Sequence, residues 1–127
     1  MVIDMHSHFA AWGGARIPED TPQRTLDMLK ANGVDGLLIL PLMNLFSSCP
    51  DHAPENDGIF EYCRQAPGRL FAGFSVNPLA GGAALEEIRR CASGHSARVL
   101  KLHPWLQGFS VSSPEMDAVA ALCRELG

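Results

Sequence analysis

The sequence alternates four times between a short apolar stretch and an amphipathic segment, and no other feature constrains the fold as strongly. The apolar stretches begin near residues 2, 34, 70 and 98 of the 127-residue chain, and apolar residues at helical spacing follow each of them. Strict alternation of strand and helix favours an α/β fold with parallel strands and right-handed crossovers. The run from Leu37 to Leu40 is apolar throughout, which is typical of a strand covered on both faces.

Cap and turn residues predict where these elements begin and end. Thr21-Pro22 and Ser113-Pro114 each pair an N-cap residue with a proline at the first helical position. Asn32-Gly33 is typical of a helix end. The expected strands are residues 1–9, 34–43, 70–76 and 98–103, and the expected helices are residues 22–32, 56–65, 83–92 and 114–126. The longer connections follow the strands, and in parallel α/β folds that end of the sheet carries the functional loops.

The length of the chain fits half of a closed α/β barrel. An eight-stranded barrel takes about 250 residues, with ~200 as the lower end. We therefore expect residues 1–127 to form a single half-barrel domain, the N-terminal half of a (β/α)8 TIM-type barrel, ending before a fifth strand. Such a half-barrel exposes two sheet edges and its concave face. We expect either a missing C-terminal half or a homo-oligomer in which two copies pair.

Composition excludes several classes of function. Ten Lys and Arg residues against fourteen Asp and Glu residues give a net charge of −4, so there is no basic stripe for nucleic acid. No apolar run approaches the ~20 residues of a membrane span, and the first residues show no secretory leader. Four cysteines without a CxxC motif indicate reduced thiols. We expect a cytoplasmic protein that acts on a small molecule.

Two histidines, His6 and His8, stand at the carboxyl end of the first expected strand. Residues i and i+2 of a strand share a face with Cα atoms about 6.6 Å apart, so both imidazoles can bind one metal ion at about 2.0–2.1 Å. In a regular strand Asp4 shares this face, where it can accept the second ring N–H of a ligand histidine. The alternative is a polar strand end in contact with solvent.

A second polar pair, Lys101 and His103, ends the fourth expected strand. An unpaired ammonium between Leu100 and Leu102 is costly to bury, which favours a lysine that faces a metal ion or an anionic substrate. We predict that Lys101 and His103 are catalytic residues and point to the concave side. The alternative is a lysine that extends out of the sheet end beside a histidine that caps a turn.

Weaker candidates lie in the connections that follow the strands. Asn77-Pro78 is either part of a site or simple turn chemistry. Cys49 has no assignable base, which argues against a nucleophilic thiol. His52 and His95 have no partner at ligand spacing and are expected at the surface. Residues expected either to line a pocket or to pack within their loops are Trp12, Trp105, Gln107 and Phe109.

The order of three stretches resembles that in the amidohydrolase superfamily. Residues 2–9 contain Asp4-Met5-His6-Ser7-His8 and resemble its opening DxHxH strand. Residues 71–78, FAGFSVNP, and residues 99–109, VLKLHPWLQGF, are similar to later strands of its amidohydrolase 2 branch. The resemblance implies a (β/α)8 barrel and a metal-dependent hydrolase or a non-oxidative decarboxylase, which is a lyase.

The resemblance also implies a divalent metal ion, most often zinc, held by His6 and His8. It places the other ligands on the fifth, sixth and eighth strands, and in family members with two metals a residue of the fourth strand, where Lys101 stands, bridges them. A catalytic zinc site takes three protein ligands and an open position, so we expect weak metal binding and no activity from the 127 residues alone.

Two other functions fit the same residues. One is a non-catalytic α/β binding or assembly module that keeps the fold without the chemistry. The other is a different metal-dependent barrel family that shares DxHxH. The sequence does not identify the substrate.

Overall fold

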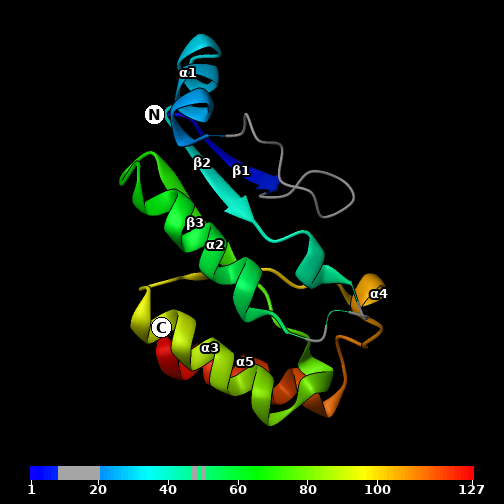
Figure 1. Cartoon of the computed structure of the whole chain (residues 1–127). Coiled ribbons are helices and arrows are strands. Elements are labelled where there is room, and N and C mark those ends of the chain that lie inside the picture. Colours follow the sequence, from blue (N-terminus) through cyan, green and yellow to red (C-terminus); the bar gives the residue numbers. More distant parts are fainter. Residues whose placement is uncertain (9–20, 47–48, 50) are drawn as a thin grey trace.

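Four parallel strands form one curved sheet in a computed structural model, which describes residues 1–8, 21–46, 49 and 51–127 (Figure 1). The strands are β1 (Ile3–His8), β2 (Gly36–Leu40), β3 (Leu70–Phe74) and β4 (Val99–Leu100). Their order is β1-β2-β3-β4, and every neighbouring pair is parallel. The predicted half-barrel is confirmed, and the 2-1-3-4 order of an open flavodoxin-like sheet is excluded.

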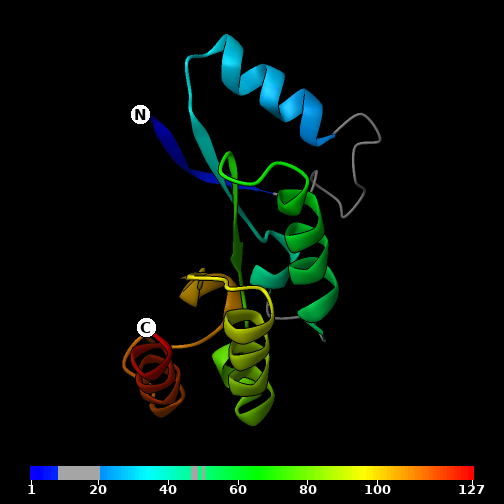
Figure 2. The same cartoon turned by 90° about the vertical axis from the view of Figure 1, so that its left-hand side faces the viewer.

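Helices alternate with the strands and follow one another around the outer side of the sheet (Figure 2). The longer helices are α1 (Pro22–Ala31), α2 (Ala53–Arg64), α3 (Gly82–Gly94) and α5 (Pro114–Leu126). Three shorter helices, η1 (Met43–Leu45), η2 (Pro78–Ala80) and α4 (Pro104–Gln107), lie in the connections after β2, β3 and β4. The sequence predicts loops at these three positions, and the structure has short helices instead. No helix of the described ranges is long and apolar enough to cross a membrane.

The ends of α1 follow the predicted cap chemistry. The Thr21 hydroxyl accepts the backbone N–H of Arg24 at 3.3 Å, and Pro22 occupies the first turn. Gly33, after the helix, has a φ of +66°, which a residue without Cβ adopts at little cost. The sequence predicts a buried stripe of Leu26, Met28 and Leu29 on this helix. The prediction is wrong at Met28, whose side chain is half exposed, whereas Leu29 is buried.

The core lies between the sheet and the outer helices and has two parts. Leu37 and Ile39 of β2 pack with Ile59 of α2. Phe74 of β3 packs with Ile88 of α3, and α5 closes this second part. Burying one such side chain stabilises the fold by about 1.5–3 kcal/mol relative to leaving it in water. Because one face of each strand is committed to these helices, the other face forms the concave side of the sheet.

A one-residue bulge interrupts β1. Asp4 pairs with Leu37 and Ser7 pairs with Ile39, so β1 advances three residues while β2 advances two. Register partners share a face, and an extra residue reverses the alternation. Asp4 therefore lies on the helix side with Leu37, contrary to the regular alternation expected from the sequence. Regular alternation along β1 places Val2 on the concave side, but Ile3, the partner of Gly36, takes that position.

Two sheet edges and part of the concave face are exposed in the described part of the chain. Within it, β1 pairs only with β2 and β4 only with β3. On the concave side Leu38 is buried, but its register partner Phe71 is 39% exposed, and Met5 of β1 is 61% exposed. Exposed sheet edges and exposed apolar side chains favour association.

We predict that a protein of these 127 residues self-associates, most simply as a two-fold pair of half-barrels. Size-exclusion chromatography with light scattering should give a mass above the monomer value of 13.7 kDa. Phe71→Ser should weaken the association, whereas Leu79→Ser, at an exposed position in η2, should not. A single 13.7 kDa species over a wide range of concentrations would contradict the prediction.

Candidate functional site

The His6 and His8 side chains meet at the carboxyl end of β1. Their Nε2 atoms are 3.1 Å apart, and the ring centroids are 5.0 Å apart at an interplanar angle of 70°. The bulge between Asp4 and Ser7 includes His6. Ser7 points to the helix side, and the imidazoles on either side of it, His6 and His8, project from the opposite face. The strand end thus presents two imidazole nitrogens to a common point.

The separation of the two Nε2 atoms fits two ligands of one metal ion. Bonds of about 2.0–2.1 Å from nitrogens this far apart enclose an angle of roughly 100° at the ion, close to a tetrahedral angle. Within residues 1–8, 21–46, 49 and 51–127, no group of three His, Cys, Asp or Glu side chains could hold a metal ion. The described residues therefore provide two ligands, and a complete metal site needs at least one further protein ligand.

The residue that orients His8 is Pro41 rather than Asp4. The Asp4 carboxylate accepts the backbone N–H of His6 at 3.0 Å, a group that the bulge displaces from the regular ladder. The His8 Nδ1 lies 3.1 Å from the carbonyl oxygen of Pro41, directly after β2. A carbonyl can only accept, so His8 Nδ1 donates to it, and in the neutral ring the lone pair is on Nε2, which faces the His6 Nε2. This tautomer is the one a metal ligand at Nε2 needs.

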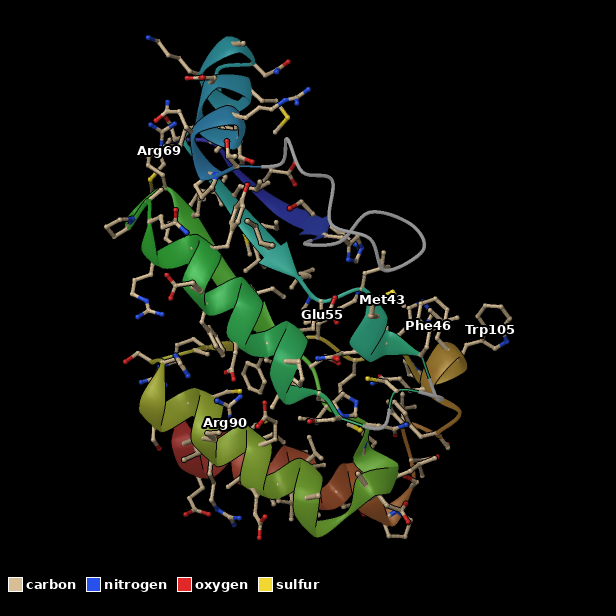
Figure 3. The ribbon with its side chains drawn as sticks, viewed as in Figure 1. Met43, Phe46, Glu55, Arg69, Arg90 and Trp105 are labelled. Carbon is tan, nitrogen blue, oxygen red and sulfur yellow. The ribbon has the colours of Figure 1, made fainter. Side chains whose placement is uncertain are left out.

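Glu55 orders the connection that carries Pro41. Its carboxylate accepts the backbone N–H groups of Leu42, Met43 and Asn44 at 2.8, 3.0 and 2.6 Å. Figure 3 shows Glu55, near the start of α2, beside Met43. Three charge-assisted hydrogen bonds on one carboxylate hold η1 in place immediately after Pro41. The sequence does not predict this role of Glu55, because no local pattern indicates that a glutamate at a helix start binds the backbone of the preceding connection.

Lys101 lies on the concave side of the sheet. Its neighbours Leu100 and Leu102 both pack against the core of α3 and α5, so Lys101 between them faces the other way. Its backbone N–H donates to the Phe74 carbonyl at 2.8 Å, which extends the ladder beyond β4. Lys101 is half-buried there. Its predicted catalytic role stays a prediction.

His103 is the N-cap residue of α4. Its Nδ1 accepts the backbone N–H of Leu106 at 3.4 Å, so the turn-capping alternative is realised. This contact places the ring proton on Nε2, which leaves His103 able to donate a hydrogen bond. Its ring centroid lies 6.5 Å from that of Trp105, whose side chain is 84% exposed and projects outward (Figure 3). Capping through Nδ1 does not exclude the predicted catalytic role of His103, which stays a prediction.

The other candidates separate into packing and surface residues. Phe109 is buried and packs inside the protein, Gln107 is buried and also lines a cavity, and Trp12 lies outside the described residues. Asn77 performs turn chemistry, because its side chain accepts the Leu79 N–H at 3.0 Å. Burial raises the pKa of the Cys49 thiol, which further argues against a nucleophile.

A cavity of about 710 Å³ lies between the start of α2, η2 and α3. His52, Asn77 and Gln107 contribute to its wall, whereas His6 and His8 do not. His52 is half-buried rather than a surface residue, and burial lowers its pKa. The cavity is therefore separate from the histidine pair.

Glu87 joins α3 to α2 next to this cavity. Burial raises the pKa of its carboxyl, but hydrogen bonds from Arg90 at 2.7 and 2.8 Å and from Asn56 at 2.7 Å outweigh burial. The net pKa lies below the usual value of 4.5. Arg90 also pairs with Asp57 of α2 at 2.7 Å and lies between the two helices in Figure 3.

A family model for amidohydrolases, Amidohydro_2, matches residues 3–127. A search of curated proteins finds no match to the chain. The match to the family model confirms the family that the three sequence motifs indicated.

Solved structures with the same fold include two decarboxylases and a hydrolase. A 2,6-dihydroxybenzoate decarboxylase from Rhizobium is 18% identical, with a TM-score of 0.76 over 98% of this chain and 47% of its own. A variant of a 5-carboxyvanillate decarboxylase from Novosphingobium aromaticivorans, with bound manganese and 3-methoxy-4-hydroxy-5-nitrobenzoic acid, is 15% identical, with a TM-score of 0.79 over 99% and 48%. A probable 2-pyrone-4,6-dicarboxylic acid hydrolase from Acinetobacter baumannii, with bound citric acid, is 15% identical, with a TM-score of 0.63 over 98% and 46%. The chain spans about half the length of each.

Acid should destabilise the fold partly through Glu87. A carboxyl whose pKa is lower in the fold contributes stability that is complete above its usual value of 4.5 and is lost as the pH falls through the folded-state value. Glu87→Gln should therefore reduce the difference in urea-unfolding free energy between pH 7 and pH 3. Glu86→Gln, at an exposed neighbouring position, should leave that difference close to wild type. Equal pH dependence in the wild type and Glu87→Gln would contradict this account.

Proposed function

This chain belongs to the amidohydrolase family, and we propose that it forms the first half of the barrel and provides the first two metal ligands of a metal-dependent enzyme. The observation that carries the proposal is the pair of His6 and His8 Nε2 atoms, 3.1 Å apart at the carboxyl end of β1. Active sites of α/β barrels lie at this end. The hydrogen bond between His8 Nδ1 and the Pro41 carbonyl, which leaves the lone pair of the neutral ring on Nε2, supports metal binding over the non-catalytic alternative.

The proposed reaction class is non-oxidative decarboxylation of a small carboxylic acid, with hydrolysis as the second candidate. Two similar structures are decarboxylases that act on substituted benzoates, which favours the first, and one is a probable hydrolase of a dicarboxylic acid. All three substrates carry a carboxylate. The ammonium group of Lys101 on the concave side suits recognition of that carboxylate.

Each residue has a separate role in this proposal. His6 and His8 hold a divalent ion, which when bound polarises a substrate oxygen or activates water. The Pro41 carbonyl keeps the His8 Nε2 unprotonated. His103 donates a hydrogen bond, or a proton, to the substrate through Nε2, because its Nδ1 caps α4. We propose zinc, which imidazole ligands suit well, and manganese is the alternative that a similar structure suggests.

Four further βα units would complete the barrel and supply the remaining ligands. They come either from a C-terminal half of the same polypeptide or from a second copy of this chain. The similar structures are about twice as long as this chain, which supports the first source. We also propose a cytoplasmic location, because all four cysteines are free thiols.

The metal assignment predicts loss of metal when both imidazoles are removed. In the complete enzyme, the double variant His6→Ala, His8→Ala should lose its bound zinc or manganese, measured by inductively coupled plasma emission. His95→Ala is the matched control, because His95 lies at the end of α3, stacked on Phe60, and its loss should leave the metal content unchanged. An unchanged metal stoichiometry in the double variant would reject the assignment.

The role of His103 can be separated from helix capping. Asparagine caps helices well but cannot transfer a proton at neutral pH. His103→Asn in the complete enzyme should keep the fold and lower kcat by about 100-fold or more if His103 is a general acid. Unchanged turnover would leave His103 with a capping role alone.

A further inference from the structure

Gln107 is a buried amide that connects the carboxyl ends of three strands. Its side chain is completely buried. The Oε1 atom accepts the backbone N–H of His103 at 2.7 Å, directly after β4. The Nε2 atom donates to the carbonyl of Val76, after β3, at 2.8 Å and to the carbonyl of Asn44, after β2, at 3.2 Å. Gln107 thus uses both ends of its amide on backbone groups of different strand ends.

The helix that contains Gln107 depends on these contacts for its position. α4 has only four residues, Pro104–Gln107, and a single turn is not stable by itself. The Gln107 backbone N–H donates a hydrogen bond to the His103 carbonyl at 2.9 Å. The Gln107 backbone carbonyl accepts a hydrogen bond from Asn77 Nδ2 at 3.2 Å. The N-cap residue His103 and the last residue Gln107 are therefore bonded to each other, and Gln107 is bonded to Asn77 after β3.

An amide is the group that these partners need. One backbone N–H requires an acceptor, and two backbone carbonyls require donors, all reached from one side chain. A carboxylate of the same size would offer acceptors only, and a methionine would offer only a weak sulfur acceptor and no donor. Because the Gln107 side chain is completely buried, each lost partner leaves a buried polar group unsatisfied.

We propose that Gln107 is a positioning residue that holds His103 in the orientation in which Nδ1 caps α4 and Nε2 carries the ring proton as a donor. Two hydrogen bonds connect Gln107 to the His103 ring. The Gln107 amide binds the His103 backbone N–H, and the Leu106 N–H of the same turn donates to the His103 ring at 3.4 Å. The inference deepens the proposed function and rests on it, since it assumes that His103 acts on the substrate. Gln107 itself touches no reacting group.

The test follows the His103 ring in the 127-residue chain by ¹⁵N NMR, which reports the tautomer and does not need activity. Wild type should show the Nε2–H tautomer. Gln107→Met should shift the two ring ¹⁵N resonances toward each other, as a mixture of tautomers does. The matched control is Gln65→Met, because Gln65 is exposed after α2 and bonds only within that helix end among the described contacts. Should Gln107→Met lose the near-ultraviolet circular dichroism of a folded chain, Gln107→Asn, a shorter amide that cannot span the same partners, replaces it with the same expectation.

An unchanged Nε2–H tautomer in the folded Gln107 variant would overturn the proposal. In the complete enzyme the same variant should lower kcat by roughly 100-fold with little change in KM, as expected for a misplaced catalytic group. Loss of the proposed metal site would leave the NMR result untouched. A shifted tautomer with normal turnover would instead refute the catalytic consequence while keeping the structural one.

Discussion

Buried side-chain amides hold together the carboxyl ends of the strands, and the rest of the structure at that end depends on them. Asn56 of α2, completely buried, accepts the Ser75 N–H and donates to the Ser75 carbonyl, both at 3.0 Å. It satisfies the backbone just after β3 as a neighbouring strand would. Asn44 donates to Asn56 at 3.0 Å and accepts from Gln107 through its carbonyl, so the amides form one network. A buried amide that loses its partner costs about 1–3 kcal/mol, whereas a made bond contributes only ~1 kcal/mol, so such a network favours one arrangement over near alternatives.

The network connects directly to the histidine pair. Glu55 and Asn56 are adjacent at the start of α2, and Glu55 binds the backbone of residues 42–44. That backbone continues from Pro41, whose carbonyl sets the His8 tautomer. The orientation of His8 at the end of β1 therefore depends on a helix, α2, that packs on the neighbouring strand β2. On the other side Gln107 connects the network to His103.

The two histidines and Lys101 come from opposite edges of the half-sheet, β1 and the end of β4. In a closed barrel the first and fourth strands lie across the mouth from each other, and the space between them is where a substrate meets residues of both. The described chain leaves that space open on one side. A metal-dependent enzyme with these residues needs further strands for this reason. The unpaired sheet edges and the exposed Phe71 predict association.

Periodicity and cap chemistry in the sequence by themselves determined the order of the elements and their parallel arrangement. The start of α1 at Thr21-Pro22 and the histidine pair at the strand end follow from residues close together in the chain. Tertiary structure alone decided the bulge that turns Asp4 to the helix side, and the place of α4. It also decided the roles of Glu55 and Gln107. The physical reason is distance along the chain: Gln107 bonds to the carbonyl of Asn44, 63 residues away, and His8 to that of Pro41, 33 residues away. Local patterns carry no signal for such contacts, because they form only once the sheet has brought the strand ends together.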